Sequence, residues 1–470
     1  MALTATRFRP SFRVLFRHLP TLWHFGCGLT LCTVFVCPEL RSEELPPLTV
    51  TAGRQQDDAT DPAAGFPLLD AAALALLPVH KGTYQDLFAA VAGSYGGSPS
   101  AGTFSLRGMN QDGLFHPVGT AANPLIPVLE DGAPLSVATL RYLPPVLWDL
   151  AGAEVLRGPQ SLGPGPNGMG GALRLHTAAA GFGHDGTALL EAAGNRTLRA
   201  GIAQDFVLLP NELALRFSMY HGESDGDVTN LFNADEAFGA TRRDRLQARL
   251  RWQPRNSRDA VYDLSLVHDR SHGNPFGTAR EVSGYDLLDR KTALNLDPSF
   301  PARRDALVLN ATLALPGDLE LKSTTALQRL EVNPFIDLDE TPVLRWMANG
   351  NIDERRLTQD LGVAREEGPF QWRAGGYVEA ASYQLGYSGI GIRPLPAGSP
   401  FRSIGREDVG VLALYGRGDR EFRENLHLTG GLRLQHERRD VQVAAEVEPR
   451  PETRSADDTA DTVLLPELGL

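Results

Sequence analysis

The side chains that could do chemistry in this chain do not form a catalytic cluster. The sequence has no His-Glu-x-x-His zinc motif and no Walker phosphate-binding loop, and its histidines are dispersed. His268 and His272 have the four-residue spacing that aligns two ligands on a helix, but they lie at the end of a predicted strand, where that spacing separates them. We therefore predict no catalytic residue, no metal site and no cofactor, and a protein that is not an enzyme.

The elements that carry the polar side chains are predominantly β-strands. Beyond residue 181, apolar and polar residues alternate in runs of about 9–11 residues, the length that a tilted strand needs to cross a bilayer. Short links alternate with long polar loops, such as residues 222–243 and 273–303, which favours an outer-membrane barrel over a soluble sandwich. The clearest runs lie at residues 213–220, 245–252, 262–266, 307–315, 370–378 and 426–434.

One of these runs carries arginines on a single face, namely Arg245, Arg249 and Arg251. An arginine on a lipid-facing strand costs about 2–4 kcal/mol near the middle of the bilayer. We therefore expect this face to point into the lumen, where it can meet an anionic group.

A loop rich in glycine and proline joins two further strand-like segments. Residues 154–157 (EVLR) and 172–177 (ALRLHT) alternate like strands, and the 14-residue link 158–171 contains six glycines and three prolines. Proline removes backbone donors and glycine permits backbone angles closed to other residues, so the link is neither helix nor central strand. It is predicted to be a loop of defined shape.

Three blocks in this order are similar to the plug domain of a TonB-dependent outer-membrane receptor. They are FSLRG at 104–108, PVLEDGAPL at 127–135, and EVLRGPQ at 154–160 followed by NGMGGA at 167–172. The chain departs from the family pattern at Gly163-Pro164, where a leucine and an aromatic residue usually precede the next glycine.

The resemblance implies an α/β plug domain followed by an antiparallel transmembrane β-barrel. Plugged transporters of this kind have 22 strands, and roughly 11–12 can be counted here. We therefore expect either a fragment of a longer product or a truncated product that does not assemble. The predicted divisions are 1–42, signal peptide; 45–61, TonB box and linker; 62–178, plug domain; and 181–470, the N-terminal half of the barrel.

The N-terminal segment and the composition agree with an exported protein. Four arginines among the first 17 residues precede an apolar run too short to span a bilayer, which is typical of a signal peptide. All three cysteines lie within the first 37 residues, so the mature protein would have no thiol. The net charge of -12 argues against a nucleic-acid partner.

A short helix is predicted after residue 82 in the plug. Thr83 is suited to cap it and Gly93 to end it. Its apolar residues recur at spacings of three and four and are expected in the core: Tyr84, Leu87, Phe88 and Val91.

By the resemblance, the protein actively imports a scarce ligand across the bacterial outer membrane, most commonly a ferric siderophore. Its partners would be the TonB energy-transducing complex, outer-membrane lipid and the small-molecule ligand. A β-prone segment near the mature N-terminus would couple to TonB by strand addition; its residues are Leu48, Thr49, Val50 and Thr51.

The resemblance and the residue types also suggest two groups of plug residues. Four charges are expected to pair with each other or with the barrel wall: Arg107, Asp131, Glu154 and Arg157. Four residues in a polar segment are the weaker candidates for ligand contact: Met109, Gln111, Phe115 and His116. The alternatives are a truncated fragment that does not transport, a receptor for cobalamin, haem or oligosaccharide, and an outer-membrane enzyme.

Overall fold

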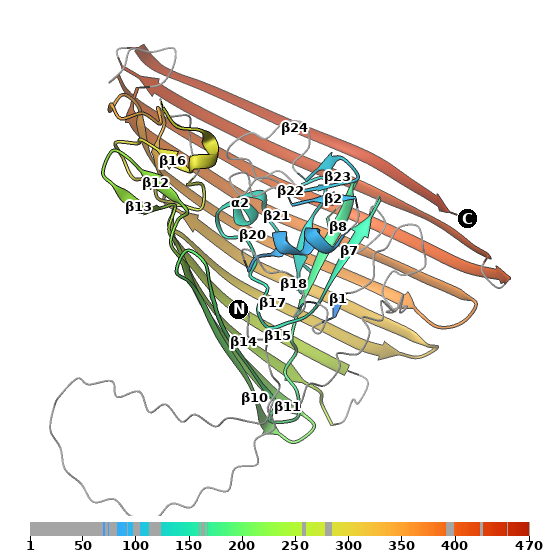
Figure 1. Cartoon of the computed structure of the whole chain (residues 1–470). Helices are drawn as coiled ribbons and strands as arrows, with labels where there is room; N and C mark the ends of the chain where they lie inside the picture. The colour runs from blue at the N-terminus through green and yellow to red at the C-terminus, as the bar shows by residue number, and fades with distance from the viewer. Residues whose placement is uncertain are drawn as a thin grey trace, which may run out of the picture.

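The structure is a computed structural model. It describes residues 69–70, 74, 82–91, 93–96, 104–111, 124–158, 160, 165–166, 168–255, 260–277, 284–391, 399–423, 426–448 and 450–469. Within these ranges the chain forms a small domain that lies in the hollow of one large curved sheet (Figure 1). The predicted signal peptide and TonB box lie outside the described residues.

The small domain is built around a five-stranded sheet with the order β1-β7-β8-β5-β6. Strands β7 and β8 pair antiparallel across the glycine-rich link, and β5 pairs parallel with β8. Its strands are β1 (Leu69–Asp70), β2 (Ser94–Tyr95), β3 (Ser105–Leu106), β4 (Met109–Asn110), β5 (Val128–Glu130), β6 (Ala133–Leu135), β7 (Leu150–Arg157) and β8 (Gly171–Thr177), and its helices are η1 (Tyr84–Ala90) and α2 (Val137–Tyr142).

The predicted helix after residue 82 forms a 3-10 helix, η1. Its four apolar residues are all buried in the domain core, as expected from their spacing. The capping prediction is wrong: Thr83 has extended backbone angles but its side chain makes no capping hydrogen bond, and the helix ends at Ala90, with Val91 rather than Gly93 as its C-cap. Instead, the Asp86 carboxylate accepts a hydrogen bond from the Gly82 backbone N–H at 2.7 Å.

The Asp131-Gly132 turn predicted between two strands joins β5 to β6. Both residues have positive φ, 51° and 86°. Asparagine, aspartate and glycine adopt this left-handed region most readily, which is why this pair forms a tight hairpin here. The turn lies against the large sheet, because the Asn310 side chain of that sheet donates to the Asp131 carbonyl at 3.0 Å and Arg249 of the same sheet pairs with the Asp131 carboxylate.

The large sheet contains 13 strands, all but one of them in a single antiparallel path from β9 to β24. The twelve strands of the path are β9 (Gly186–Ala193), β10 (Thr197–Leu209), β11 (Leu213–Ser224), β14 (Thr241–Trp252), β15 (Ala260–Gly273), β17 (Ala302–Leu315), β18 (Leu319–Val332), β20 (Met347–Arg365), β21 (Phe370–Ile390), β22 (Pro400–Arg423), β23 (Leu426–Val447) and β24 (Arg450–Gly469). The short β19 (Phe335–Asp337) pairs beside β20. The count agrees with the sequence prediction, but the last four strands, at 20–24 residues, are about twice the predicted length.

The two ends of the sheet differ. At one end, tight turns such as residues 316–318 join the strands. At the other, residues predicted as polar loops form β12 (Val228–Asn230), β13 (Asp235–Phe238), η2 (Leu287–Asp289) and β16 (Lys291–Thr292), with β12 pairing parallel to β16 (Figure 1). We call these the short-turn end and the long-loop end.

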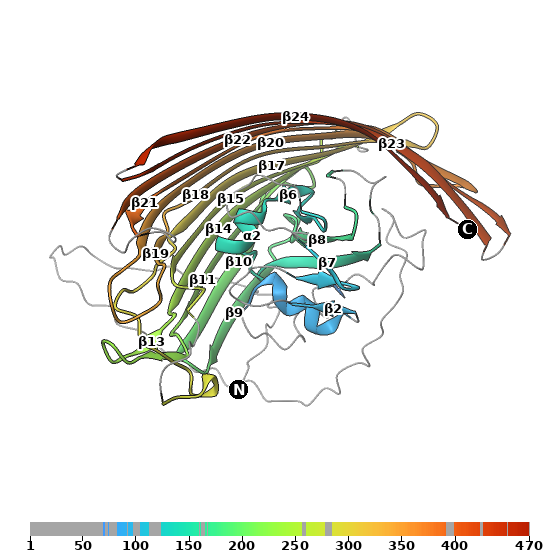
Figure 2. The same ribbon diagram turned by 90° about the horizontal axis from the view of Figure 1, so that it is seen from above.

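Seen from above, the sheet bends in an arc around the small domain and does not close on itself over the described residues (Figure 2). Alternate residues of each strand therefore face either the small domain or the outside. Of the two histidines predicted at a strand end, His272 lies one residue before the end of β15 and His268 lies further inside it.

Candidate functional site

A group of deeply buried charges lies where β5 meets the wall. Glu130 accepts ion pairs from Arg245 of β14 and Arg304 of β17, each at 2.8 Å. Both arginines also approach Asp269 of β15, at 3.3 and 3.4 Å. All four residues are buried, with exposed fractions of 3% or less. We call Glu130, Arg245, Asp269 and Arg304 the ionic cluster.

The ionic cluster changes the titration of its glutamate. Burial alone would raise the pKa of Glu130, but the charges of Arg245 and Arg304 and their hydrogen bonds outweigh it and lower the pKa from 4.5 to about 2. Glu130 is therefore ionised at every physiological pH. Arg243 also approaches Asp269, at 3.4 Å, so the two carboxylates face three arginines.

A second contact follows directly at Asp131. Its carboxylate accepts hydrogen bonds from the Thr177 backbone N–H and hydroxyl, at 2.9 and 2.6 Å, and an ion pair from Arg249 at 3.3 Å. Arg249 also donates to the Thr177 carbonyl at 2.7 Å. The arginine face predicted to point into the lumen does so, with Arg245 and Arg249 on the small domain and Arg251 paired to Asp263 of the wall.

A third contact joins the wall to Trp148 and Asp149, the two residues directly before β7. The Arg216 guanidinium of β11 donates to both oxygens of Asp149, with a shortest distance of 2.6 Å, and also pairs with Asp205 at 3.1 Å. The Trp148 indole N–H donates to the Ser218 hydroxyl at 2.9 Å. Trp148 also covers Gly201, where an added Cβ would come within 2.7 Å of the indole ring.

The four plug charges predicted from the sequence lie in different surroundings, and they do not all reach the wall. Asp131 reaches the wall, whereas Glu154 pairs inside the domain with Arg174 at 3.6 Å and His176 at 3.1 Å. Arg107 is exposed in the β3–β4 turn, with a φ of 50°. Arg157 ends β7, paired with Gly171.

Sequence reasoning missed Glu130, the plug carboxylate of the ionic cluster. The available signal was a glutamate next to the Asp-Gly turn at the end of an apolar strand, in PVLEDG. A carboxylate at such a position is buried by its strand and requires a cation. Arg304 and Asp149 were missed because nothing in the sequence places them beside their partners, which lie 174 and 67 residues away.

A polar cavity of about 660 Å³ separates the domain from the wall towards the short-turn end. On its wall side, the Asp360 carboxylate accepts hydrogen bonds from the Gly165 backbone N–H at 2.8 Å and the Tyr415 hydroxyl at 2.7 Å. Gly165 belongs to the predicted loop, so Asp360 joins that loop to β20. Ionisable lining residues include Glu154, Arg174, His176, Lys322 and Arg373.

An aromatic cluster lies at the long-loop end, around α2. The Tyr142 ring stacks on Phe300 and meets Phe276 edge-on, with centroid distances of 6.0 and 5.7 Å. The Arg141 guanidinium lies 5.5 Å from the Phe276 ring centroid. Ser136 caps α2 by accepting a hydrogen bond from the Thr139 N–H at 3.0 Å, which fixes the direction in which Arg141 and Tyr142 project.

The residues predicted for ligand contact are only partly described. Met109 is exposed at β4, and its sulfur would meet a Cβ added at Gly170. Gln111 is buried, its backbone N–H donating to the Phe104 carbonyl at 2.9 Å. Phe115 and His116 lie outside the described residues, as do Leu48, Thr49, Val50 and Thr51.

The described residues form neither a metal centre nor a nucleophile elbow. In the part of the chain that the structure describes, no three His, Cys, Asp or Glu side chains come together to hold a metal ion. One Gly-x-Ser-x-Gly run exists at residues 222–226, but its Ser224 hydroxyl lies against the Thr197 hydroxyl at 2.7 Å and donates to the Asp225 carbonyl at 3.1 Å, at the end of β11. A nucleophile elbow joins a strand to a helix, which this run does not do.

These features define a class of membrane receptor in which a plug occupies the hollow of a large antiparallel sheet. No described helix is both long and apolar enough to traverse a bilayer. Residues 76–172 match the family model of the TonB-dependent receptor plug domain. The predicted resemblance to TonB-dependent outer-membrane receptors is confirmed, and the class places the chain in the bacterial outer membrane. Its members are receptors and transporters rather than enzymes.

Solved structures share the fold. The ferric yersiniabactin uptake receptor FyuA from Yersinia pestis is 18% identical, with a TM-score of 0.71 over 85% of this chain and 61% of that one. The unliganded ferric citrate transporter FecA is 13% identical, with a TM-score of 0.63 over 85% and 59%. The copper transporter OprC is 15% identical, with a TM-score of 0.59 over 83% and 58%.

The chain thus spans about three fifths of the length of the solved receptors that it matches. No curated protein sequence matches it. From here on, the small domain is called the plug and the large sheet the barrel wall.

Proposed function

We propose that the protein imports a scarce nutrient across the outer membrane, with energy supplied through TonB. The observation that carries this proposal is the ionic plug–wall interface formed by Glu130, Asp131 and Asp149 with arginines of the wall. The attraction between the paired charges resists opening of such an interface, and the hydration that the charges regain on separating offsets part of the cost, so the interface can open under applied work and reform. A plug that must move and return requires that property.

Coupling to TonB would occur through Leu48, Thr49, Val50 and Thr51. A flexible segment with free backbone donors and acceptors can complete a sheet edge of the partner. Force applied at that segment reaches the plug through the intervening chain, and Asp131 then holds the plug against it. Of the other predicted charges, Glu154 would stabilise β7 against β8 within the plug, because both of its partners lie on β8.

For the ligand we propose a ferric siderophore or a similar anionic iron complex. Two of the receptors with this fold are named for ferric complexes. The half-buried Arg141 guanidinium beside the half-buried Phe276 ring, at the long-loop end, supports the proposal, because a guanidinium next to a ring can meet an anionic ligand. Copper, which OprC transports, is the second candidate by fold, and it prefers imidazole or sulfur ligands.

The test is uptake by cells that lack their own iron-complex receptors and produce this protein. Radioactive iron would be offered as a catecholate complex, as a citrate complex and as a hydroxamate complex, with radioactive copper as a separate arm. Deletion of residues 48–51 should abolish uptake while surface binding persists. Arg141→Ala should weaken binding of the transported complex about tenfold, as expected when a cation–π and charge contact is lost.

The controls separate the two parts of the proposal. Arg255→Ala removes an exposed arginine at the short-turn end and should change nothing. Uptake that survives deletion of residues 48–51 would disprove the coupling role. Failure to accumulate any of the iron complexes or copper would disprove import.

A further inference from the structure

A small cavity lies between helix α2 of the plug and the barrel wall. Ser136 and Thr139 line it from the plug, and Arg304, Leu330 and Glu354 line it from the wall. Its volume is about 10 Å³, and a single water molecule needs about 10–15 Å³ on the same measure. The cavity therefore has room for one water molecule.

The register of three strands places opposite charges on the two sides of this cavity. Arg304 of β17 lies directly opposite Leu330 of β18, which lies directly opposite Glu354 of β20. Neighbouring strands are about 4.8 Å apart, so two strand spacings separate the arginine from the glutamate. The apolar Leu330 side chain lies between them and offers neither charge a hydrogen bond.

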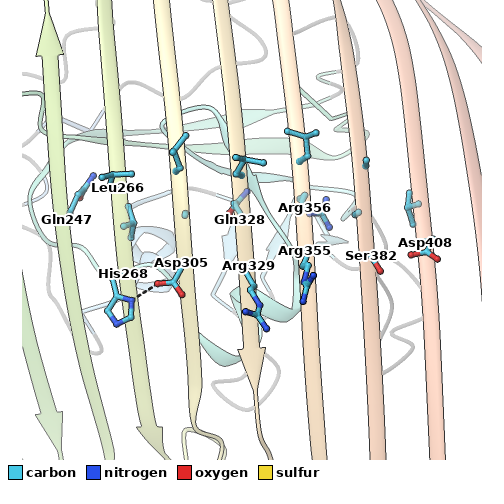
Figure 3. A pocket seen from close by; sticks show the side chains of 18 of the residues that line it. Gln247, Leu266, His268, Asp305, Gln328, Arg329, Arg355, Arg356, Ser382 and Asp408 are labelled. Carbon is cyan, nitrogen blue, oxygen red and sulfur yellow. Dashed lines mark hydrogen bonds and ion pairs between the residues drawn. The ribbon is translucent and has the colours of Figure 1, made fainter.

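All three side chains of this row face the plug. Consecutive residues of a strand point to opposite faces, and Figure 3 shows this alternation for Arg355 and Arg356 of β20. Arg355 is exposed on the outward side, whereas Arg356 is buried on the inward side, which Glu354 shares. Arg304 and Leu330 are buried as well, with exposed fractions of 2%.

Each of the two charged residues keeps one buried atom that the described residues do not satisfy. The Arg304 Nη atoms contact the carboxylates of the ionic cluster and Gln328, but the Arg304 Nε has no hydrogen-bond partner among the described residues. Glu354 accepts a hydrogen bond from the Arg356 Nε on Oε1 at 3.2 Å, and its Oε2 likewise has none. Buried polar atoms are normally hydrogen-bonded, to protein or to ordered water. A donor and an acceptor that line one small cavity can be satisfied together by one water molecule.

The charges on the two sides of the cavity are complementary. On the Arg304 side, the two carboxylates of the ionic cluster face three arginines. On the Glu354 side, Arg356 pairs with both Glu354 and Glu379. A chloride ion in the cavity would be repelled by Glu354, and a sodium ion by Arg304. Water is neutral and dipolar, so both charges orient it favourably.

We propose that this cavity binds one ordered water molecule, which accepts a hydrogen bond from the Arg304 Nε and donates one to the Glu354 Oε2. The water joins the ionic cluster to the second group of buried charges, Glu354, Arg356 and Glu379. Ser136 and Thr139 cover it from the plug side. The contact between α2 and the wall is therefore completed by a solvent molecule and not by a direct ion pair.

A water at this position affects how α2 leaves the wall. Ser136 caps α2, so the cavity is covered only while α2 is docked. When α2 leaves, the Arg304 Nε and the Glu354 Oε2 meet bulk water instead, so this part of the interface separates and reforms at little cost. That consequence rests on the plug movement proposed above, whereas the water site is a property of the resting protein.

Crystallography of the full chain tests the site directly. At a resolution that shows ordered water, one peak should lie within hydrogen-bond distance of both the Arg304 Nε and the Glu354 Oε2. Crystals soaked in bromide identify an anion, because bromide scatters anomalously and replaces chloride but not water. A direct ion pair between Arg304 and Glu354, a bromide peak, or a site without density would each overturn the proposal.

Leu330→Met tests the water without relying on its density. Methionine has nearly the volume of leucine but a longer, flexible chain that reaches into the cavity, so it displaces the water and leaves two charged atoms unsatisfied. Hydrogen exchange of the Leu143 amide, which donates to the Thr139 carbonyl at 2.8 Å, should then become about tenfold faster. Leu327→Met on the same strand alters an exposed leucine of the outward face and should leave this rate unchanged.

The sign of the effect distinguishes a water site from a dry apolar gap. Filling a dry gap adds packing contacts, so unchanged or slower exchange in Leu330→Met would overturn the proposal, as would an equal effect of Leu327→Met. Circular dichroism and native electrophoresis check that both variants are folded, and the crystal structure of the unaltered protein decides the question without either of them. Neither experiment involves uptake, so its outcome is independent of the proposed import.

Discussion

Replacing Glu130 by glutamine tests whether the ionic cluster holds the plug in the barrel. Glutamine has nearly the same shape but no charge, so Arg245 and Arg304 would be left with Asp269, which also pairs with Arg243, as their shared carboxylate. Lowering a carboxyl pKa from 4.5 to about 2 corresponds to about 3 kcal/mol in favour of the ionised form, at about 1.4 kcal/mol per pH unit. Breaking one partner of a buried ion pair costs about 3–5 kcal/mol. The free energy derived from the pKa shift of Glu130 therefore agrees with the usual cost of breaking a buried ion pair.

Hydrogen exchange of the plug is the suitable assay, because it measures opening of β5 and β8 without unfolding the barrel. A loss of about 3 kcal/mol should speed exchange of amides such as Leu173, which donates to the Pro127 carbonyl, by about a hundredfold. Glu331→Gln is the control, since this glutamate is partly exposed on the outward face and its pair with Arg329 is worth about 0–1 kcal/mol. Equal protection in the two variants would refute the assigned role of Glu130.

The same cluster predicts how plug docking depends on pH. Because the pKa of Glu130 is lowered in the folded protein, its contribution is fully present above the unfolded value near 4.5 and is lost as pH falls towards 2. Exchange-measured protection of β5, corrected for the intrinsic rate, should fall across this window in the unaltered protein and less steeply in Glu130→Gln. Parallel pH profiles would show that other groups control docking.

Other contacts give smaller expected effects. Arg249→Met should lower the exchange protection of the plug by about 1–3 kcal/mol, since Asp131 keeps its two Thr177 donors. Arg251→Met is the control and should leave this protection unchanged, because Arg251 pairs with Asp263 of the wall. Gly201→Ala should cost about 1–3 kcal/mol and shift tryptophan fluorescence, because the new methyl group would displace the Trp148 ring; Gly430→Ala, where nothing lies within 4 Å, is its control. If the two glycine variants show the same stability and the same fluorescence, the Trp148 ring does not pack against Gly201 of β10.

The arrangement of the strands can be predicted from the periodicity of the sequence, but the pairing of the charged side chains cannot. Alternation in the run 245–252 correctly indicates that Arg245 and Arg249 point inward, because side chains on one strand face share a parity. Parity does not say which anion they meet, since Arg304 and Glu130 approach only through the register of three strands and the depth at which the plug sits. The capping role given to Thr83 failed for a related reason: its backbone is right, but Asp86 supplies the local carboxylate that binds Gly82 instead.

The strand lengths were underestimated because the apolar alternation marks only the lipid-facing part of each strand. In β20 the alternating apolar residues Leu357 and Leu361 are followed towards the long-loop end by Asp353 and Arg355 on the same outward face. Hydrogen bonding continues through this charged portion because the ladder depends on the backbone and not on the side chains. A search for apolar runs therefore ends where the headgroup level begins.

The distribution of apolar contacts bears on how the proposed movement of the plug would be resisted. The main plug core, from Tyr84 to Leu175, consists only of plug residues, so the plug can shift without exposing it. Around α2 the opposite holds, because Tyr142 and Leu143 share an apolar cluster with Phe300 and Tyr383 of the rest of the chain. Helix α2 follows β6 directly, and β6 pairs with β5, which carries Glu130. A ligand that disturbs the aromatic cluster would therefore act on the ionic cluster through one short hairpin, and exchange at β5 measured with and without a bound iron complex would detect it.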